Sequence, residues 1–356
     1  MSFKIHDNIE CLEKKEWNCS DNNSLLKKDT LKYFGLRHKA IKHYYIVNDK
    51  NRFYAQKFNI SISKIARYSK NFFLRLISSF SYKIKLLYLS NSFITNIPFY
   101  HLSESFSLYK LVQKIQKISD SDIVVVPDFL INSKHNKSLT KEFVKIEVES
   151  EMTLAIDSRW TTFNDYKLAL KTKYRKLINK IESNSIGVKV RKIDENYLKN
   201  NMGKIQKLYN NVYSRSSFSG PRFNTSIFMD LLKENEIKIY GYFLTNKLVA
   251  FSSEIHYNQK MYSYFVGLDY KINKTHYVYA KILCESIKEA IKQKKKELVF
   301  GRTANEFKSN FGAVPKKAYI FIYFKNKILK NIIGYFFKKI KIKKWHQRSP
   351  FKIKSK

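Results

Sequence analysis

The amino-acid sequence predicts an α/β protein with a mixed sheet in two halves of comparable size. β-prone runs alternate with helical patterns along the chain, which is the first observation that predicts this class. The second is the length, because 356 residues suit two domains or one large domain. The third is the composition, in which 44% hydrophobic and 15% aromatic residues suffice for a core and exclude disorder as the main state.

The first half begins with a polar segment over residues 1–30, which we expect to be a loosely packed lead-in. Two β-prone runs then flank residues 48–51, and this pattern predicts a hairpin. Pro127 marks the end of a short apolar strand. The other elements expected in this half are strands over 84–102 and 143–157 and a helix over 108–118 that is capped by Ser103–Ser105.

The second half begins with one long helix expected over residues 160–181, where apolar residues form a stripe. Three β runs over 238–270, joined by short turns, predict an antiparallel meander. The remaining elements expected here are strands over 188–193, 297–303 and 318–324 and helices over 198–213, near Phe228 and over 277–293. The resulting limits are 31–158 for a first domain, 159–325 for a second, and 326–356 for a basic amphipathic tail.

The chain carries 68 Lys and Arg against 29 Asp and Glu, a net charge of +39 at pH 7. Such a field attracts polyanions, namely nucleic acid, anionic lipid head groups or a phosphorylated small molecule. The alternative is a solvated surface that reflects a composition rich in Lys, Asn and Ile. Basic residues cluster over 171–180, 292–296 and 338–356, and the last cluster predicts a helix on an anionic membrane or along RNA, or else a frayed terminus.

Several classes of function lack their usual signals in this sequence. No CxxC pair is formed by the three cysteines, Cys11, Cys19 and Cys284, and we therefore expect a reducing, cytoplasmic location. Because of the basic segment 338–356, we also expect peripheral contact with the inner face of the membrane. The histidines have no pattern of metal ligands, so no metal site is expected. The Gly-rich patterns of Rossmann and P-loop nucleotide sites do not occur either.

A family resemblance rests on residues 160–323, and above all on FGRTANEFKSNFGAVPKKAYIF. There a strand ends in a GRT turn at Gly301–Thr303, and a K-S-x-x-G-A-x-P segment follows from Lys308. This order resembles the Fem-like, peptidoglycan-biosynthesis-type group of GNAT acyltransferases. The resemblance implies the mixed-sheet GNAT-like (acyl-CoA N-acyltransferase) fold, in two tandem domains of which the first is degenerate.

The same resemblance implies the function. The chain would transfer an acyl or aminoacyl group to an amine, or a hydroxyl, of a cell-envelope or sugar-linked acceptor, without a covalent intermediate. The donor would be acyl-CoA or aminoacyl-tRNA, with no metal, and tRNA would then be a partner. Two rivals stay open: a non-enzymatic protein that binds RNA or a membrane surface on an inactive GNAT scaffold, and an ordinary acyl-CoA N-acyltransferase.

One departure from the GNAT pattern bears on the donor. Ordinary GNAT enzymes hold the coenzyme A pyrophosphate on a Gly-rich turn, because backbone N–H groups there complement phosphate. The corresponding turn here, residues 271–277, contains no glycine. Either Lys271, Lys274 and Thr275 bind phosphate through their side chains, or the donor is not coenzyme A. Lys173, Arg175 and Lys176, in the basic run of the 160–181 helix, are further candidates for phosphate or RNA contacts.

Acyl transfer to an amine needs a proton acceptor, and two carboxylates are candidates. Glu254 lies among apolar residues of its strand, and Asp269 follows the next strand. The alternatives are that Glu254 faces solvent opposite a lysine and that Asp269 caps the following segment. The Arg302 loop, defined as Arg302–Lys308, contains the candidates for substrate binding, which are Arg302, Thr303, Asn305, Glu306 and Lys308.

Two alternatives concern these substrate-binding residues. Arg302 and Glu306 would form a purely structural pair if the loop had no function. Tyr262 and Tyr264, which alternate along one strand, are candidates for substrate contact or else core residues. The acceptor, the donor and the oligomeric state are not determined by the sequence.

Overall fold

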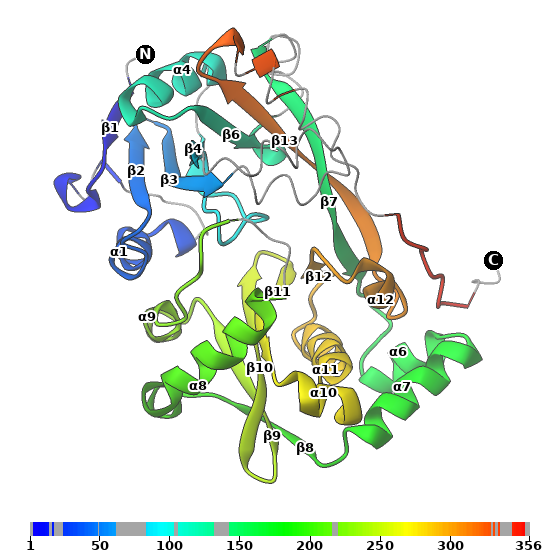
Figure 1. Cartoon of the computed structure of the whole chain (residues 1–356). Helices are drawn as coiled ribbons and strands as arrows, with labels where there is room; N and C mark the ends of the chain where they lie inside the picture. The colour runs from blue at the N-terminus through cyan, green and yellow to red at the C-terminus, as the bar shows by residue number, and fades with distance from the viewer. Residues whose placement is uncertain are drawn as a thin grey trace. The chain divides into compact units, whose positions relative to one another are not determined.

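The computed structural model describes residues 3–13, 16–17, 24–48, 50–61, 83–102, 106–131, 142–215, 220–328, 330–331, 334 and 344–352. The chain divides into two compact units (Figure 1). Unit 1 comprises Met1–Val148, Ser217–Asn224 and Ala318–Lys343, and unit 2 comprises Glu149–Ser216, Thr225–Lys317 and Lys344–Lys356. Strands β7 (Val144–Ala155) and β13 (Val314–Phe324) each contribute residues to both units.

The strands of unit 1 run in the order β1-β2-β3-β4-β6-β13, with β5 also paired to β3. Their bounds are β1 (Lys4–His6), β2 (Lys42–Val47), β3 (Arg52–Ser61), β4 (Lys83–Tyr88), β5 (Tyr100–His101) and β6 (Ile123–Pro127). The predicted hairpin is confirmed between β2 and β3, where the Asn51 amide donates to the side-chain oxygen of Asn48. Because β4 and β6 pair in parallel while the other pairs are antiparallel, the sheet is mixed.

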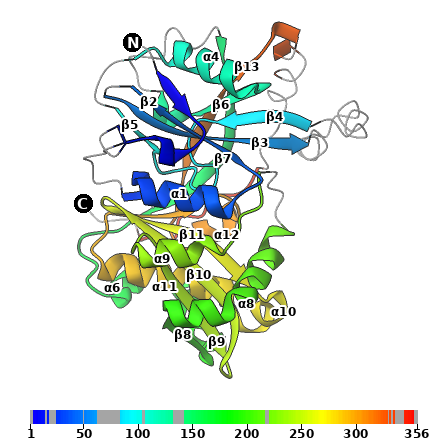
Figure 2. The ribbon, with the colours of Figure 1, turned by 90° about the vertical axis from the view of Figure 1, so that its left-hand side faces the viewer.

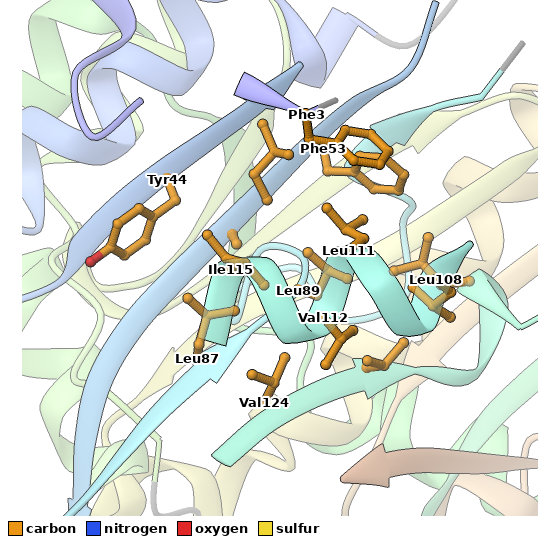
Figure 3. Close-up of a cluster of buried hydrophobic side chains, with 14 of the residues drawn as sticks. Phe3, Tyr44, Phe53, Leu87, Leu89, Leu108, Leu111, Val112, Ile115 and Val124 are labelled. Atoms are coloured by element: carbon orange, nitrogen blue, oxygen red, sulfur yellow. The ribbon is translucent and has the colours of Figure 1, made fainter. Parts of the chain in front are cut away.

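The core of unit 1 lies between this sheet and helix α4 (Leu108–Ser119). Figure 3 shows Leu111 and Val112 of α4 turned toward residues of the strands, among them Leu87 and Val124. The α4 helix is capped by Ser107, whereas the predicted cap at Ser103–Ser105 lies outside the described residues. The other helical elements of this unit are α1 (Lys28–Arg37) and the short 3-10 helices Ile9–Cys11, Ser24–Leu26 and Asp128–Leu130.

The strands of unit 2 run in the order β7-β12-β11-β10-β9-β8. Their bounds are β8 (Val188–Lys192), β9 (Lys238–Leu244), β10 (Lys247–Tyr257), β11 (Lys260–Leu268) and β12 (Glu297–Gly301). The predicted meander over 238–270 is confirmed, since β9, β10 and β11 pair antiparallel (Figure 2). The parallel pair β11–β12 makes this sheet mixed as well.

Helices cover both faces of the unit 2 strands (Figure 1). Helix α8 (Glu195–Tyr213) lies so close to β11 that a Cβ on Gly267 would be 2.8 Å from the Leu208 backbone carbon. On the other face, α11 (Val278–Lys292) packs Leu283 and Ile287 against strand residues such as Leu298. The remaining helices are α6 (Phe163–Ala169), α7 (Thr172–Asn184), α9 (Ile227–Lys233), α10 (Tyr270–His276) and α12 (Asn305–Ser309).

The prediction of one helix over 160–181 is wrong, because the chain forms α6 and α7 with a break between them. Leu170 has extended dihedral angles (φ −78°, ψ 145°) and forms a bridge with Phe351. The Lys171 amide donates to the Pro350 carbonyl at 2.8 Å. A segment far along the chain therefore takes the backbone groups that would have continued the helix.

Further segments differ from the sequence predictions. The described part of residues 1–30, expected to be a loosely packed lead-in, contains core residues such as Phe3, Leu12 and Leu25, and its strand β1 pairs with β2. Residues 271–277, expected as a turn, belong to helix α10 up to His276. The described part of the predicted amphipathic tail is extended over 344–352, while most of the rest lies outside the described residues. Phe351 packs against the rings of Trp160 and Tyr166, with centroids 5.5 and 6.1 Å apart. These aromatic contacts attach residues 344–352 to unit 2.

Candidate functional site

The candidate site lies at the carboxyl edge, which we define as the ends of β11 and β12 together with α10, the first turn of α11 and the Arg302 loop. The parallel pairing of β11 with β12 runs from Lys260–Glu297 to Tyr262–Val299. Beyond that pair β11 continues to Leu268 and β12 ends at Gly301. Carboxyl ends of neighbouring parallel strands are where open α/β sheets bind ligands. Asp269 and Arg302 each directly follow one of these ends.

The junction between β11 and α11 is closed by its own side chains. The Asp269 carboxylate oxygen Oδ1 accepts hydrogen bonds from the Lys271 and Ile272 amides, at 3.0 and 3.4 Å. The Asn273 oxygen Oδ1 accepts from the Tyr279 amide, in the first turn of α11, at 2.7 Å. These three amides are of the kind that would otherwise complement a phosphate. Asp269 thus has the capping role that the sequence left open as an alternative.

Exposed basic residues lie on two neighbouring helices beside this junction. Lys271 and Lys274 of α10 are exposed, and so are Lys173 and Lys176 of α7. Helices α7 and α10 are in contact, and the Lys180 ammonium lies 5.9 Å from the centroid of the Tyr277 ring. The phosphate-binding candidates from two distant stretches of sequence therefore lie on adjacent helices. Of the other two candidates, Arg175 is half-buried, and the Thr275 hydroxyl donates to the Ile272 carbonyl within α10.

The Arg302 loop adjoins the same junction, because the rings of Tyr279 and Phe307 stack with centroids 5.8 Å apart. Its backbone is strained, since Thr303 (φ 66°) and Ala304 (φ 50°) are both left-handed without being glycine. Within the described part of the chain, two buried polar atoms of this loop have no hydrogen-bond partner. They are Nε of Arg302, a donor, and Oδ1 of Asn305, an acceptor. Such groups are rare in folded proteins and call for an explanation.

Lys308 is the buried charged residue of the loop, with an exposed fraction of 3%. Its Nζ donates to the carbonyl oxygens of Gly301 and Arg302, at 3.2 and 2.7 Å. Burial lowers the pKa of the Lys308 amine to about 7, against smaller opposing effects of Glu149 and Glu151 on β7. The amine thus holds the strained turn from its inner side, which the sequence alone does not indicate.

Glu306 pairs with a residue that sequence analysis missed. Its carboxylate accepts from the Arg348 guanidinium at 2.6 Å, and the pair with Arg302 that the sequence left open as an alternative does not occur among the ion pairs of the described residues. The Arg348 amide donates to the Ser309 hydroxyl at 3.1 Å, and the Gln347 amide group donates to the Ala313 carbonyl at 3.0 Å. The extended segment 344–352 therefore braces the Arg302 loop and the residues that follow it.

The two candidate tyrosines of β11 have different surroundings. Tyr262 takes part in the last β11–β12 pair, and burial followed by the charges of Glu151 and Glu297 raises the pKa of its hydroxyl. Tyr264 packs against the ring of Phe265 with centroids 4.4 Å apart, and burial raises the pKa of its hydroxyl as well. Both hydroxyls therefore stay protonated at neutral pH.

Glu254 lies away from the carboxyl edge. It is 5% exposed, pairs in register with Ser263 near the start of β11, and lines a pocket of about 300 Å³ between the strands and α11. Neither Asp269 nor Arg302 lines that pocket. The structure therefore brings together α10, α7 and the Arg302 loop, whereas Glu254 lines a pocket whose walls include none of these three elements. The hydrogen bond from the Tyr279 amide to Asn273 was missed, because Asn273 lies inside α10 and not at the N-cap position of α11, which Tyr277 occupies.

Two classes of feature do not occur among the described residues. No group of His, Cys, Asp or Glu there is arranged to hold a metal ion. No helix in that part of the chain has the length and apolar character needed to cross a membrane.

Solved structures with a similar fold include the following two. A conserved protein of unknown function from Bacteroides thetaiotaomicron matches at 10% identity over 91% of this chain and 100% of its own, with a TM-score of 0.52. FemX matches at 10% identity over 94% of this chain and 100% of its own, with a TM-score of 0.50. No family model and no curated protein matches the sequence. At this identity the likeness concerns the fold alone, and the predicted α/β fold with a mixed sheet, similar to that of FemX, is confirmed.

Proposed function

We propose that this chain transfers an aminoacyl group from an aminoacyl-tRNA to an amine of a cell-envelope or sugar-linked acceptor. The observation that carries the proposal is the closed β11–α11 junction, whose amides are bonded to Asp269 and Asn273 beside exposed lysines of α7 and α10. The fold shared with FemX supports the reaction class by analogy.

The closed junction favours a tRNA donor over coenzyme A. A pyrophosphate bound at this junction would have to displace the Asp269 carboxylate, and the two anions would repel each other. A tRNA backbone instead needs a surface of separated cations, which Lys173, Lys176, Lys271 and Lys274 supply. The high net charge of +39 acts in the same direction by steering a polyanion toward the protein.

The reaction needs one proton acceptor and donors for the developing oxyanion. The acceptor amine attacks the ester carbonyl carbon of the aminoacyl-tRNA, a C–N bond forms, and the C–O bond to the ribose breaks. We assign the proton from the amine to Asp269 Oδ2, because Oδ1 is fixed by the α10 cap while Oδ2 has no hydrogen bond within the described residues. The proton then passes to the departing ribose oxygen.

Arg302 and Asn305 complement the two reacting groups. The unpaired Nε–H of Arg302 is a donor for the ester carbonyl oxygen, and the unpaired Oδ1 of Asn305 is an acceptor for a hydrogen of the attacking amine. Their lack of partners in the free protein is then explained by the substrates. Lys308 holds the backbone of Arg302 by donating to the carbonyl oxygens of Gly301 and Arg302.

Donor identity is tested by calorimetry with two probes, bulk aminoacyl-tRNA and coenzyme A. We expect tRNA to bind with an affinity that falls as salt rises, and coenzyme A not to bind. Tight coenzyme A binding without tRNA binding would favour the ordinary acyl-CoA N-acyltransferase. Binding of tRNA without transfer of radiolabelled amino acid to an envelope-precursor fraction would favour a non-enzymatic RNA-binding protein.

The base is tested with the pair Asp269→Asn and Asp269→Ala. Asparagine keeps the cap oxygen but cannot take a proton, so we expect Asp269→Asn to fold normally and to lose transfer by about 100-fold or more. Alanine removes the cap as well and costs about 1 kcal/mol of stability in addition. If Asp269→Asn transfers at the wild-type rate, the assignment of the base is wrong.

We also propose that the chain acts in the cytoplasm, at the inner face of the membrane where envelope precursors are made. Residues 326–356 contribute the basic charge for contact with anionic lipid. Sedimentation with vesicles containing phosphatidylglycerol, compared with neutral phosphatidylcholine vesicles, tests this: equal binding to both would contradict it.

A further inference from the structure

The pocket below α11 lies outside the site proposed for aminoacyl transfer. It has a volume of about 300 Å³, within the range of small-molecule sites, and its walls are β8, β9, β10 and the second half of α11. Charged and hydroxyl groups dominate its lining, which includes Lys192, Tyr240, Glu254, Glu285, Glu289 and Lys292. The pocket is therefore suited to a polar ligand.

Glu254 is the most buried of the carboxylates in this pocket. Its side chain is 6% exposed, and its Oε1 lies 3.2 Å from Nε2 of His256. The hydroxyl of Tyr240 lies beside Glu254 and Glu289, and burial together with these carboxylates raises the pKa of that hydroxyl. Within the described residues no Lys or Arg forms an ion pair with Glu254. A buried carboxylate without a permanent cation is costly and favours a cationic partner.

The other charges of the pocket are divided between paired and unpaired groups. Glu285 is bound by Lys288 at 2.8 Å, and Glu289 is bound by Lys238 at 3.2 Å. Lys192 and Lys292 are exposed, and neither takes part in an ion pair within the parts of the chain that the structure describes. The groups without a Lys, Arg, Asp or Glu partner are thus the Glu254 carboxylate, which has His256 and Tyr240 beside it, and two ammonium groups on exposed side chains.

We propose that this pocket binds a small zwitterion, with a primary ammonium group at Glu254 and an anionic group at Lys192 and Lys292. The ligand class is an amino acid or another amine that carries a carboxylate several bonds away from its nitrogen. Each unmatched charge of the pocket then has an opposite charge. The site is separate from the carboxyl edge, so the inference does not depend on the proposed transfer.

The test is calorimetric titration of the full chain with ω-amino acids from glycine to 8-aminooctanoate, with hexylamine and hexanoate as matched probes. We expect an optimum chain length within the series, and we expect 6-aminohexanoate to bind about ten-fold or more tightly than either matched probe. Equal affinity for 6-aminohexanoate and one of the matched probes would overturn the zwitterion class. Absence of binding by every member of the series would overturn the site.

Three variants locate the binding on the protein. The affinity for the best ligand should fall by about ten-fold or more in Glu254→Gln, and likewise in the double variant Lys192→Ala/Lys292→Ala. Lys189→Ala is the control, because this lysine is exposed on the same strand and does not line the pocket. The double variant decides the question if Glu254→Gln fails to fold by circular dichroism, since its changes are on exposed side chains. Unchanged binding in the double variant would overturn the proposal.

Discussion

Two regions of unit 2 each contain a buried charged side chain, and they satisfy it in different ways. In the Arg302 loop, the Lys308 amine bonds two main-chain carbonyl oxygens, which do not titrate and cannot rotate away. In the pocket below α11, Glu254 has the side chains of His256 and Tyr240 beside it. Side-chain partners can rearrange around a ligand, whereas carbonyl partners fix a backbone. The partners of Lys308 therefore fix the backbone of the loop, whereas the side chains beside Glu254 can rearrange around a ligand.

The backbones of the two regions also differ, because the loop contains strained residues and the pocket walls are regular secondary structure. The Arg302 loop contains the left-handed residues Thr303 and Ala304, a conformation that costs on the order of 1–3 kcal/mol per residue. Near the pocket the walls are strands and a helix, with one bulge in β10 between Ser252 and Glu254. Strain persists only where surrounding contacts enforce it. For the loop, those contacts come from Lys308 and from residues 344–352.

The largest expected effect is a pH dependence of the free energy of unfolding that arises from the buried amine of Lys308. The folded-state pKa of Lys308 is about 7, below the ordinary value of 10.5, so the unfolded chain binds more protons between these values. The free energy of unfolding should therefore rise as the pH increases from 7 to 10.5, by up to ~4 kcal/mol. The same contribution is lost as the pH falls back toward 7. Urea unfolding of wild type and Lys308→Met from pH 6.5 to 10.5 measures this: the variant should lack the Lys308 contribution. Identical slopes for the two proteins would contradict the burial of the charge.

A smaller effect on the free energy of unfolding is expected where residues 344–352 pack against the residues that follow the Arg302 loop. Gly312 has φ +89°, and a Cβ there would lie 2.2 Å from Cε2 of Phe351. We expect Gly312→Ala to cost about 2–4 kcal/mol in thermal or urea unfolding. Gly203→Ala is the matched control, because nothing lies within 4 Å of the added Cβ in α8, and it should gain about 0.5–1 kcal/mol. If both variants lose the same stability, the chain end does not brace this region.

The smallest effect on stability is expected at the exposed lysines of α7. Charge reversal in Lys173→Glu/Lys176→Glu should change the free energy of unfolding by less than about 0.5 kcal/mol, because both side chains are exposed. The same change should weaken tRNA binding and reduce the slope of log affinity against log salt by about 2. The double variant Lys189→Glu/Lys199→Glu, with the same charge change at exposed sites of β8 and α8, should leave that slope less affected. An equal reduction by the control would indicate attraction by net charge rather than a defined surface.

Elements with a clear apolar period were predictable, and those shaped by distant contacts were not. The stripe of α4 and the meander over 238–270 follow from local pattern alone. The break between α6 and α7 did not follow, since Leu170 and Lys171 read as helical and their partners are Phe351 and Pro350. A local pattern cannot reveal a partner that lies about half the chain away.

The candidate site shows the same division. Asp269 and Arg302 were predictable as edge residues, because each follows the end of a strand that could be recognised in the sequence. The separation of Glu254 from them was not predictable, since it depends on how far along β11 its pairing partner lies. The hydrogen bond to Asn273 and the pair Glu306–Arg348 also required the folded structure.

Local sequence patterns are enough to predict the strands and helices with a clear apolar period, the basic character of the chain and the residues at the ends of β11 and β12. Periodicity and turn chemistry are local, so these properties can be predicted without knowledge of the fold. Only the tertiary structure decided which charges are buried and what satisfies them. The environment of Lys308 combines carbonyls of its own turn with carboxylates of β7 more than a hundred residues earlier, and burial is a property of that assembly.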